Sequence, residues 1–308
     1  MPFPPDKQKP ATLPSPETIW IDGELVPTAE AKVSVFDHGL LYGDGVFEGI
    51  RAYGGRVLKL RSHLERLYAS ARAIRLAIPQ PIDALTAATK QTCEANGIAD
   101  GYIRLLVTRG DGPLGINPYQ CHTPRTIIIA AKIELFPQAL VDRGIRVGFS
   151  SYTRSHPQTL SPRVKSLNYL NNIMAKAEAV EAGYDEAVMF NEAGYIAEGS
   201  AENLFIVRRG RDGSPEVATP SLASGPLGGI TRGIVLDLCA GLGISTAETQ
   251  LTRFDLQTAD EAFVTGTGAE IVPVVSAAGE DIADGTPGPT TARIREAFAE
   301  YVKHAPED

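Results

Sequence analysis

Hydrophobic positions in the first half of the chain alternate with polar ones as they do in paired strands. The run TIWI at residues 18–21, the turn Asp22-Gly23 and the run ELV together predict a tight hairpin. A second hairpin is indicated where FEGIRAY and RVLKL flank Gly54-Gly55. The runs YIRLLVTRG and RTIIIAAKIEL are typical of buried strands. We therefore expect antiparallel hairpins to form a sheet in this half.

Two helices are expected to cover one face of that sheet. Apolar side chains recur at helical spacing after residue 60, at Leu64, Leu67, Tyr68, Ala71 and Ile74. Another helix is predicted from Ile82 to Asn96, because Gly97 is suited to end it. Strands followed by helices on one face indicate an α+β unit.

A break in the pattern between residues 136 and 143 marks the expected boundary between two domains. The segment FPQALVDRG places a proline and a glycine between strands, and GIRVGFSS then opens a new set. A length of 308 residues also favours two domains. We expect a small N-terminal domain at 17–136, a linker at 137–143 and a larger domain at 144–308. Residues 1–16, with six prolines, are expected to form a flexible tail.

The second half mixes strands, helices and glycine-containing loops. A helix is predicted over residues 167–182 before Gly183, followed by a hairpin turning at 191–194 and the strand NLFIV. The loop at 225–229 leads into a helix at 230–239. The strand EAFVT, the loop GTGAE, the strand IVPVV and a helix at 290–301 complete the chain.

Composition excludes several classes of protein. Hydrophobic content of 43% and charged content of 21% are typical of a globular protein. A net charge of −8 without a basic cluster argues against nucleic acid as a partner. The longest aliphatic run, residues 127–131, is too short to span a membrane. Cys93, Cys121 and Cys239 form no metal-ligand or disulfide pattern, which fits a reducing cytoplasm and argues against zinc.

Two loops could bind an anion through backbone N–H groups. In SGPLGGITR, the hydroxyl of Thr231 and the amides of Ile230 and Thr231 would form a compact phosphate site at a helix N-terminus. The ordinary alternative is a loop that needs glycine only to turn. The loop GTGAE at 266–270 is a weaker candidate of the same kind.

Lys165 could carry Schiff-base chemistry, which requires a lysine amine that can lose its charge. Lysines are usually solvated surface charges, but this one precedes an amphipathic helix and lies one turn before Tyr169. Glu198 and Glu202 in YIAEGSAEN are either site acids or exposed turn acids, and periodicity alone does not decide between these roles.

The order of these segments resembles that of the class IV aminotransferases, the fold type IV pyridoxal-phosphate (PLP) enzymes. The resemblance runs over roughly residues 18–301. It is carried by DHGLLYGDGVFEGIRAY, LRSHLERL, YIRLLVTRG, VKSLNYLNN, YIAEGSAENLF, GGITR and FVTGTGAEI. It implies a two-domain α+β fold whose larger domain contains a mixed, barrel-like sheet with helices.

For the cofactor, the resemblance implies that Lys165 holds PLP as a Schiff base and later moves a proton as the general base. Glu198 would keep the pyridine nitrogen protonated, and Tyr169 would pack beside the cofactor. The residues implied at the phosphate are Arg61, Ile230, Thr231 and Thr267.

For the substrate, the resemblance implies that backbone amides at Thr267 and Gly268, with Tyr102, bind the α-carboxylate. Arg104 would bind the second carboxylate of glutamate or 2-oxoglutarate. The apolar wall implied for the side-chain pocket consists of Phe47, Tyr42, Leu114 and Ile116. The last three would come from a second subunit, so the expected active unit is a homodimer or a higher homo-oligomer with shared sites.

The loop GDGPLGINP after YIRLLVTRG resembles that of the branched-chain amino-acid aminotransferases. The expected reaction moves the amino group of L-Leu, L-Ile or L-Val to 2-oxoglutarate in two half-reactions. Two departures concern the substrate pocket: FPQALVDRG has few of the aromatic side chains found in that group, and Gly268 stands where several members have alanine.

Three other functions share parts of this pattern. A D-amino acid aminotransferase would carry Arg and His in the loop after YIRLLVTRG. An (R)-amine transaminase or aminodeoxychorismate lyase would need only small loop changes. A non-catalytic protein could keep the fold and bind PLP or a phosphate-bearing metabolite.

Overall fold

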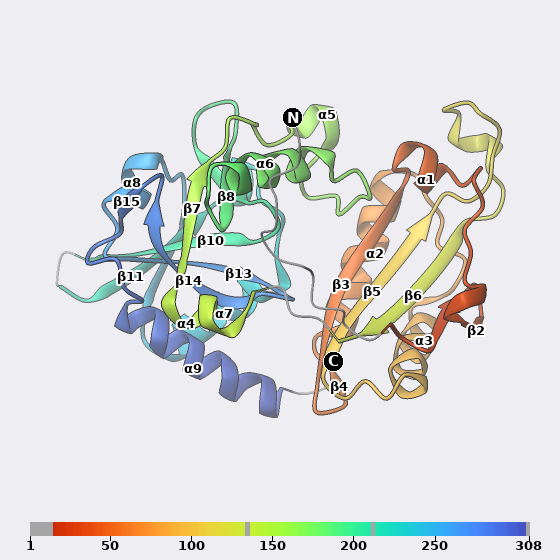
Figure 1. The fold of residues 1–308 in the computed structure, drawn as a ribbon, viewed down its shortest axis with the longest axis horizontal. Helices are drawn as coiled ribbons and strands as arrows, with labels where there is room; N and C mark the ends of the chain where they lie inside the picture. The colour runs from red at the N-terminus through yellow and green to blue at the C-terminus, as the bar shows by residue number, and fades with distance from the viewer. Residues whose placement is uncertain (1–14, 133–135, 211–212, 306–308) are drawn as a thin grey trace.

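The computed structural model describes residues 15–132, 136–210 and 213–305. These residues form two sheets, each with its own hydrophobic core. In Figure 1 the sheets lie in two lobes, which we call the small lobe (β1 to β6 with α2 and α3) and the large lobe (the elements from α4 onward). Most of the expected tail, residues 1–14, lies outside the described residues.

The small lobe confirms the predicted antiparallel hairpins. Its strands run in the order β2-β1-β6-β5-β3-β4, with every pair antiparallel. Their bounds are Thr18–Ile21 (β1), Glu24–Pro27 (β2), Gly45–Tyr53 (β3), Arg56–Val57 (β4), Gly101–Thr108 (β5) and Arg125–Ala131 (β6). The predicted strand RVLKL is cut to two residues, because Lys59 takes a left-handed conformation with φ 52° and a helix begins at Leu60.

Two helices cover one face of the small sheet, as the pattern predicts. They are α2 (Leu60–Ala73) and α3 (Ile82–Ala95), drawn behind the sheet in Figure 1. Leu64 and Leu67 of α2 are fully buried against Ile50 and Ile103 of the sheet in one apolar cluster. Full burial of each leucine stabilises the fold by about 2 kcal/mol.

The large lobe contains a mixed sheet in the order β12-β11-β10-β13-β14-β7-β8-β9, with β15 paired to β14. The pairs β11·β12, β14·β7 and β7·β8 are parallel, and the others are antiparallel. The strands are Ile145–Phe149 (β7), Glu186–Phe190 (β8), Ile196–Gly199 (β9), Asn203–Arg209 (β10), Pro215–Pro220 (β11), Ser245–Thr249 (β12), Glu261–Gly266 (β13), Glu270–Ala277 (β14) and Glu280–Asp281 (β15).

The predicted long helices of the large lobe are present with shifted ends. They are α6 (Leu170–Glu181), α7 (Ile230–Gly241) and α9 (Pro289–His304). Short helices that the pattern did not predict are α1 (His38–Tyr42), α5 (Pro157–Leu160) and α8 (Arg253–Gln257), and 3-10 turns occupy Thr28–Glu30, Pro118–Gln120 and Leu222–Ser224. None of the helices in the described ranges is long and apolar enough to cross a membrane.

The segment expected to link the domains forms a helix, α4 (Gln138–Arg143). Phe136, Leu140 and Val141 pack against the hydrophobic core of the large lobe. Helix α4 therefore packs as part of the large lobe. The predicted strand RTIIIAAKIEL is longer than β6, which ends at Ala131, and its residues 133–135 lie outside the described residues.

The two lobes also meet at a short stretch of backbone that precedes α6. Phe47 N donates to Lys165 O at 3.0 Å, Leu167 N donates to Gly45 O at 2.9 Å, and Val46 and Ser166 form an antiparallel bridge. Residues 165–167 thus pair with the edge of β3 like an added strand. This pairing sets the place of Lys165 between the lobes.

Candidate active site

A cavity of about 420 Å³ lies between the lobes. Its walls come from β3 and β5 of the small lobe, and from the Lys165 segment, β9, the loop before α7 and the β13–β14 loop of the large lobe. It is large enough for a drug-sized ligand. The sequence-predicted residues that line it are Phe47, Tyr102, Arg104, Lys165, Tyr169, Glu198, Ile230, Thr231, Thr267 and Gly268.

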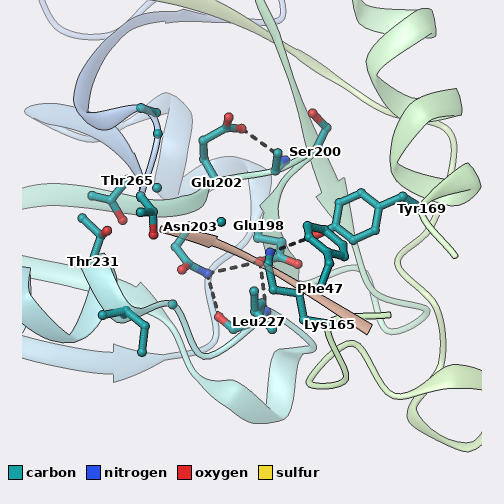
Figure 2. A pocket seen from close by; sticks show the side chains of 18 of the residues that line it. Phe47, Lys165, Tyr169, Glu198, Ser200, Glu202, Asn203, Leu227, Thr231 and Thr265 are labelled. Carbon is teal, nitrogen blue, oxygen red and sulfur yellow. Dashed lines mark hydrogen bonds between the residues drawn. The ribbon is translucent and has the colours of Figure 1, made fainter. Parts of the chain in front are cut away.

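The amine of Lys165 lies among aromatic groups. Lys165 Nζ is 3.3 Å from the Tyr169 hydroxyl and 4.6 Å from the centroid of the Phe47 ring. Phe47 and Tyr169 meet edge to face at 5.1 Å, as seen beside Lys165 in Figure 2. The backbone N–H of Lys165 donates to Ser70 Oγ at 3.2 Å, which holds the start of the side chain. The position of the amine is therefore set from both ends, by the backbone and by the two rings.

Glu198 lies at the end of β9, and its carboxylate is buried. One oxygen pairs with Arg154 NH2 at 2.6 Å, and the other accepts from Leu227 N at 2.9 Å and Asn203 Nδ2 at 3.2 Å. Burial raises the pKa of Glu198, and Arg154 opposes this rise. The carboxylate is therefore ready to share a proton with a basic group inside the cavity.

A second buried acid holds an arginine at the wall of the cavity. Glu48 accepts from Arg66 Nε and NH2, both at 2.7 Å, and from His63 Nδ1 at 2.8 Å. Burial alone would raise the pKa of Glu48, but Arg66 and His63 hold it at about 2. Arg66 NH1 donates to Gly228 O at 2.8 Å, so the guanidinium lies beside the loop that begins α7.

The structure does not bring Arg61 to the cavity, which corrects the phosphate role expected for it. Arg61 pairs with Glu65 at 3.1 Å and Asp83 at 3.3 Å, and its side chain is 49% exposed. Arg66 lies five positions further along α2 and points toward the large lobe, where it lines the cavity. The helix start LRSHLER contains both arginines, and only tertiary packing distinguishes them.

The N-terminus of α7 opens into the cavity opposite Tyr169, on the side of Thr231 and Thr265 in Figure 2. Gly229 is its N-cap residue, and a β-carbon there would collide with Asn203 Oδ1, so glycine is required. Thr265 Oγ1 is buried and has no hydrogen-bond partner among the described residues. Helix N-terminal amides, hydroxyls and a guanidinium therefore line one side of the cavity, and groups of this kind can bind an anion.

The small lobe supplies the expected substrate side chains. Arg104 NH2 donates to the Tyr102 hydroxyl at 3.0 Å, and its guanidinium lies 4.6 Å from the centroid of the Phe47 ring. Opposite Arg104 in the sheet is Gly49, where a β-carbon would collide with the Tyr102 hydroxyl. Gly49 thus gives Tyr102 its place, and the sequence pattern did not single it out.

Three residues expected in the apolar wall lie outside this cavity. Tyr42, Leu114 and Ile116 are 39%, 74% and 84% exposed and do not line it. The second-subunit role expected for them stays a prediction.

Glu202, for which the sequence left two roles open, lines the cavity and is buried. It lies against a second buried acid, Glu186, which pairs with Lys176 Nζ at 2.6 Å. Burial and Glu186 raise the pKa of Glu202 to about 8, although Lys176 opposes this rise. The two buried carboxylates therefore share one proton at neutral pH, and Lys176 pairs with Glu186.

The sequence analysis gave no role to several residues of the site. Arg154 forms an ion pair with Glu198, and Asn203 donates a hydrogen bond to it. Arg66 of α2 forms an ion pair with Glu48 of β3. Asn203 falls in the recognised segment YIAEGSAENLF, which offered a hint. Arg154 follows no pattern, because its partner lies 44 residues further along the chain.

Comparison with known proteins agrees with this geometry. Residues 45–277 match the family model of the amino-transferase class IV proteins. The branched-chain-amino-acid aminotransferase of Salmonella typhimurium is 40% identical over 286 residues, which cover 91% of each chain.

Solved structures show the same fold. The crystal structure of the Escherichia coli branched-chain amino acid aminotransferase superposes with a TM-score of 0.88 at 38% identity, covering 92% of this chain and 94% of that one. The branched-chain amino acid aminotransferase of Thermobaculum terrenum in its PLP form gives 0.83 at 32% identity, with 94% of each chain covered. The lobes, the lysine between them and the family match over most of the length lead to one conclusion: this chain belongs to the class IV aminotransferases.

Proposed function

We propose that this protein is a PLP-dependent branched-chain amino-acid aminotransferase, which moves the amino group of L-Leu, L-Ile or L-Val to 2-oxoglutarate. The observation that carries the proposal is the convergence of three different groups on one cavity. These are the Lys165 amine, the buried Glu198 carboxylate, and the anion site formed by Arg66 and the α7 N-terminus. Relatives that are 38% to 40% identical over more than 90% of this chain are named branched-chain amino-acid aminotransferases.

The donor set fits PLP. This cofactor has an aldehyde, a ring nitrogen and a phosphate, and the cavity offers an amine, a carboxylate and an anion site for them. When bound, PLP supplies an electron sink that stabilises negative charge at the substrate Cα. The orphaned Thr265 hydroxyl at the anion site is a further donor for an incoming anion.

Lys165 would have two tasks, tethering the cofactor and moving a proton. Its Nζ is free to bind an aldehyde when neutral, and after release the same atom is placed to take the proton from the substrate Cα. The Tyr169 hydroxyl at 3.3 Å orients it. Glu198, held by Arg154, would keep a proton on the ring nitrogen.

Arg66 would bind the phosphate with the amides of Ile230 and Thr231 and with Thr267. Glu48 keeps the guanidinium fixed in the wall, so little ordering is needed when the anion arrives. A planar guanidinium can form two parallel bonds to phosphate, which fixes orientation as well as charge.

For the substrate, we propose that the amides at Thr267 and Gly268 and the Tyr102 hydroxyl bind the α-carboxylate. Arg104 would bind the second carboxylate of 2-oxoglutarate. It lies over the Phe47 ring, so one wall can offer charge to glutamate and apolar surface to leucine.

The assembly we propose is a homodimer or higher homo-oligomer in which Tyr42, Leu114 and Ile116 complete the partner's apolar wall. Their exposure supports this, because a monomer would leave large apolar side chains in water. The proposed domains are 17–136 and 144–308, with the linker at 137–143, and the proposed location is the cytoplasm.

The test is a half-reaction followed by absorbance. PLP-loaded protein is mixed in turn with L-Leu, L-Ile, L-Val, the D-enantiomers and an (R)-amine, and conversion to the pyridoxamine form is recorded. We expect conversion with the three L-amino acids and its reversal by 2-oxoglutarate. Conversion by D-amino acids or (R)-amines alone would assign one of the other transaminase activities, and no conversion by any donor would refute an enzyme.

A further inference from the structure

The loop that joins β13 to β14 is held from behind by the small lobe. Strand β13 ends at Gly266, strand β14 begins at Glu270, and these two residues pair. Between them, Thr267, Gly268 and Ala269 line the cavity. Contacts with neighbouring elements help to fix the orientation of the peptides in a loop this short.

Three contacts from β3 reach this loop. Arg51 NH1 donates to Gly268 O at 3.3 Å, and Arg51 NH2 pairs with Glu270 Oε1 at 3.3 Å. The Tyr53 hydroxyl donates to the same Glu270 oxygen at 2.9 Å, and the Arg51 guanidinium lies 5.0 Å from the centroid of the Tyr53 ring. Burial raises the pKa of Tyr53, so its hydroxyl stays a donor. These three side chains form one unit, which we call the clasp.

Glu270 has a backbone conformation that needs such support. Its φ is +57°, in the left-handed region that residues with a side chain seldom adopt. Conformations of this kind persist where surrounding contacts hold them, and they are frequent at ligand sites. Arg51 and Tyr53 supply those contacts from the opposite lobe.

The bond to Gly268 O also sets which way an amide points. In a trans peptide the C=O and the following N–H point in opposite directions. Arg51 lies in a second hollow of about 500 Å³ that shares Gly268 and Ala269 with the active-site cavity. Because Arg51 draws the Gly268 carbonyl toward the second hollow, the Ala269 N–H faces away from Arg51.

The clasp is continuous with the substrate wall. Side chains two apart on a strand share a face, so Phe47, Gly49 and Arg51 lie in one row on β3. Arg51 stands directly opposite Tyr102, and Gly49 directly opposite Arg104. One strand therefore lines the substrate pocket and, two residues further on, holds the loop from behind.

We propose that Arg51, Tyr53 and Glu270 are positioning residues that fix the 266–270 loop and thereby set the affinity for substrate carboxylates. This rests on the proposed function, in which that loop binds the α-carboxylate. The three side chains touch neither substrate nor cofactor in this scheme; they act through the peptide groups of the loop.

The test compares Arg51→Met with Arg56→Met. Arg56 also joins the lobes, since its NH1 donates to Ala305 O at 3.0 Å and its NH2 to Val302 O at 3.1 Å, but it does not touch the loop. PLP content and melting temperature are recorded for both variants. The readouts are KM for L-Leu and 2-oxoglutarate, the maximal half-reaction rate, and Kd for 4-methylvaleric acid, a carboxylate with no amine to react.

For Arg51→Met we expect both KM values and the carboxylate Kd to rise by about tenfold, as when one hydrogen-bonded element of a site is lost. The maximal half-reaction rate should stay near wild type, and PLP content should change little because Arg66, Ile230 and Thr231 of the proposed phosphate site lie outside this loop. Arg56→Met should leave all the affinities unchanged. If Arg51→Met does not fold, Tyr53→Phe removes one oxygen atom, and we expect the same pattern at smaller size, with Glu270→Gln retaining most affinity.

Unchanged carboxylate affinity in Arg51→Met or Tyr53→Phe would overturn the clasp, and so would an equal loss in Arg56→Met. A loss of rate without a change of KM would overturn it too. Failure of the proposed function is separate, because it appears in the wild-type protein as a missing half-reaction with L-Leu.

Discussion

Replacing Arg154 by Met tests how the cavity keeps Glu198 charged. The two side chains are 8% and 6% exposed, and their charged atoms are 2.6 Å apart. Removal of one partner from a buried pair costs about 3–5 kcal/mol, because the remaining charge is left without compensation. Leu227 N and Asn203 Nδ2 still donate to Glu198, and the carboxyl can take up a proton. We therefore expect the free energy of unfolding to fall by the lower value, about 3 kcal/mol.

The loss should depend on pH with a definite sign. Burial already raises the pKa of Glu198 with Arg154 present, and without it the pKa rises further. A carboxyl whose folded pKa lies above its unfolded value binds protons more tightly when folded. Such a carboxyl therefore lowers the stability of the folded protein more and more as pH rises from its unfolded pKa through its folded pKa. The variant should be closer to wild type at pH 5 than at pH 8.

The assay is urea unfolding of PLP-free protein at both pH values, followed by the half-reaction with L-Leu at pH 8. Arg208→Met is the matched control, because Arg208 pairs with Glu216 at 2.7 Å while 43% exposed. An exposed pair of that kind contributes about 0–1 kcal/mol. If Arg154→Met loses no more than the control, shows no pH dependence and retains the half-reaction rate, then Arg154 does not keep Glu198 charged.

Three further outcomes are expected. Lys165→Ala should abolish turnover while a phosphate-dependent PLP affinity remains, measured by absorbance and dialysis; normal turnover would contradict the tether. Arg66→Lys should raise the Kd for PLP by about tenfold or more, because lysine cannot form the bidentate hydrogen bond from a guanidinium to the phosphate. Arg61→Lys should leave that Kd unchanged, and equal effects of the two substitutions would contradict the phosphate assignment. Burial raises the folded pKa of Glu202 to about 8, so the free energy of unfolding of the wild type should fall as pH rises from about 4.5 toward about 8, and Glu202→Gln should remove that part of the fall. An equal change between pH 5 and pH 8 in the variant and the wild type, measured by urea unfolding, would contradict the shared proton.

Local chemistry decided which parts of the fold the sequence could predict. The hairpins at Asp22-Gly23 and Gly54-Gly55 and the helix ending at Gly97 depend on residues next to each other, so they were predicted. Strand order in the large lobe depends on pairings between distant segments. The parallel pair β11·β12, with residues 216 and 245 opposite each other, had no local sign.

The site divides in the same way. Lys165, Glu198 and Thr231 lie in distinctive motifs and were found together in the cavity. Arg61 and Arg66 lie on one helix, and five positions of about 100° each place them about 140° apart around its axis. The sequence offered both arginines, but which one faces the cavity depends on how α2 packs against the large lobe.

The pairing of residues 165–167 with β3 has a consequence for motion. The amides of Phe47 and Leu167 bridge the lobes through backbone bonds of 3.0 Å and 2.9 Å, and neither bond breaks unless the lobes part or this segment peels away. Hydrogen exchange at both amides should therefore be slow and equally slow, because one opening event exposes them together. Their exchange rate then measures how often this backbone pairing opens, and Lys165 belongs to the segment that takes part in that opening.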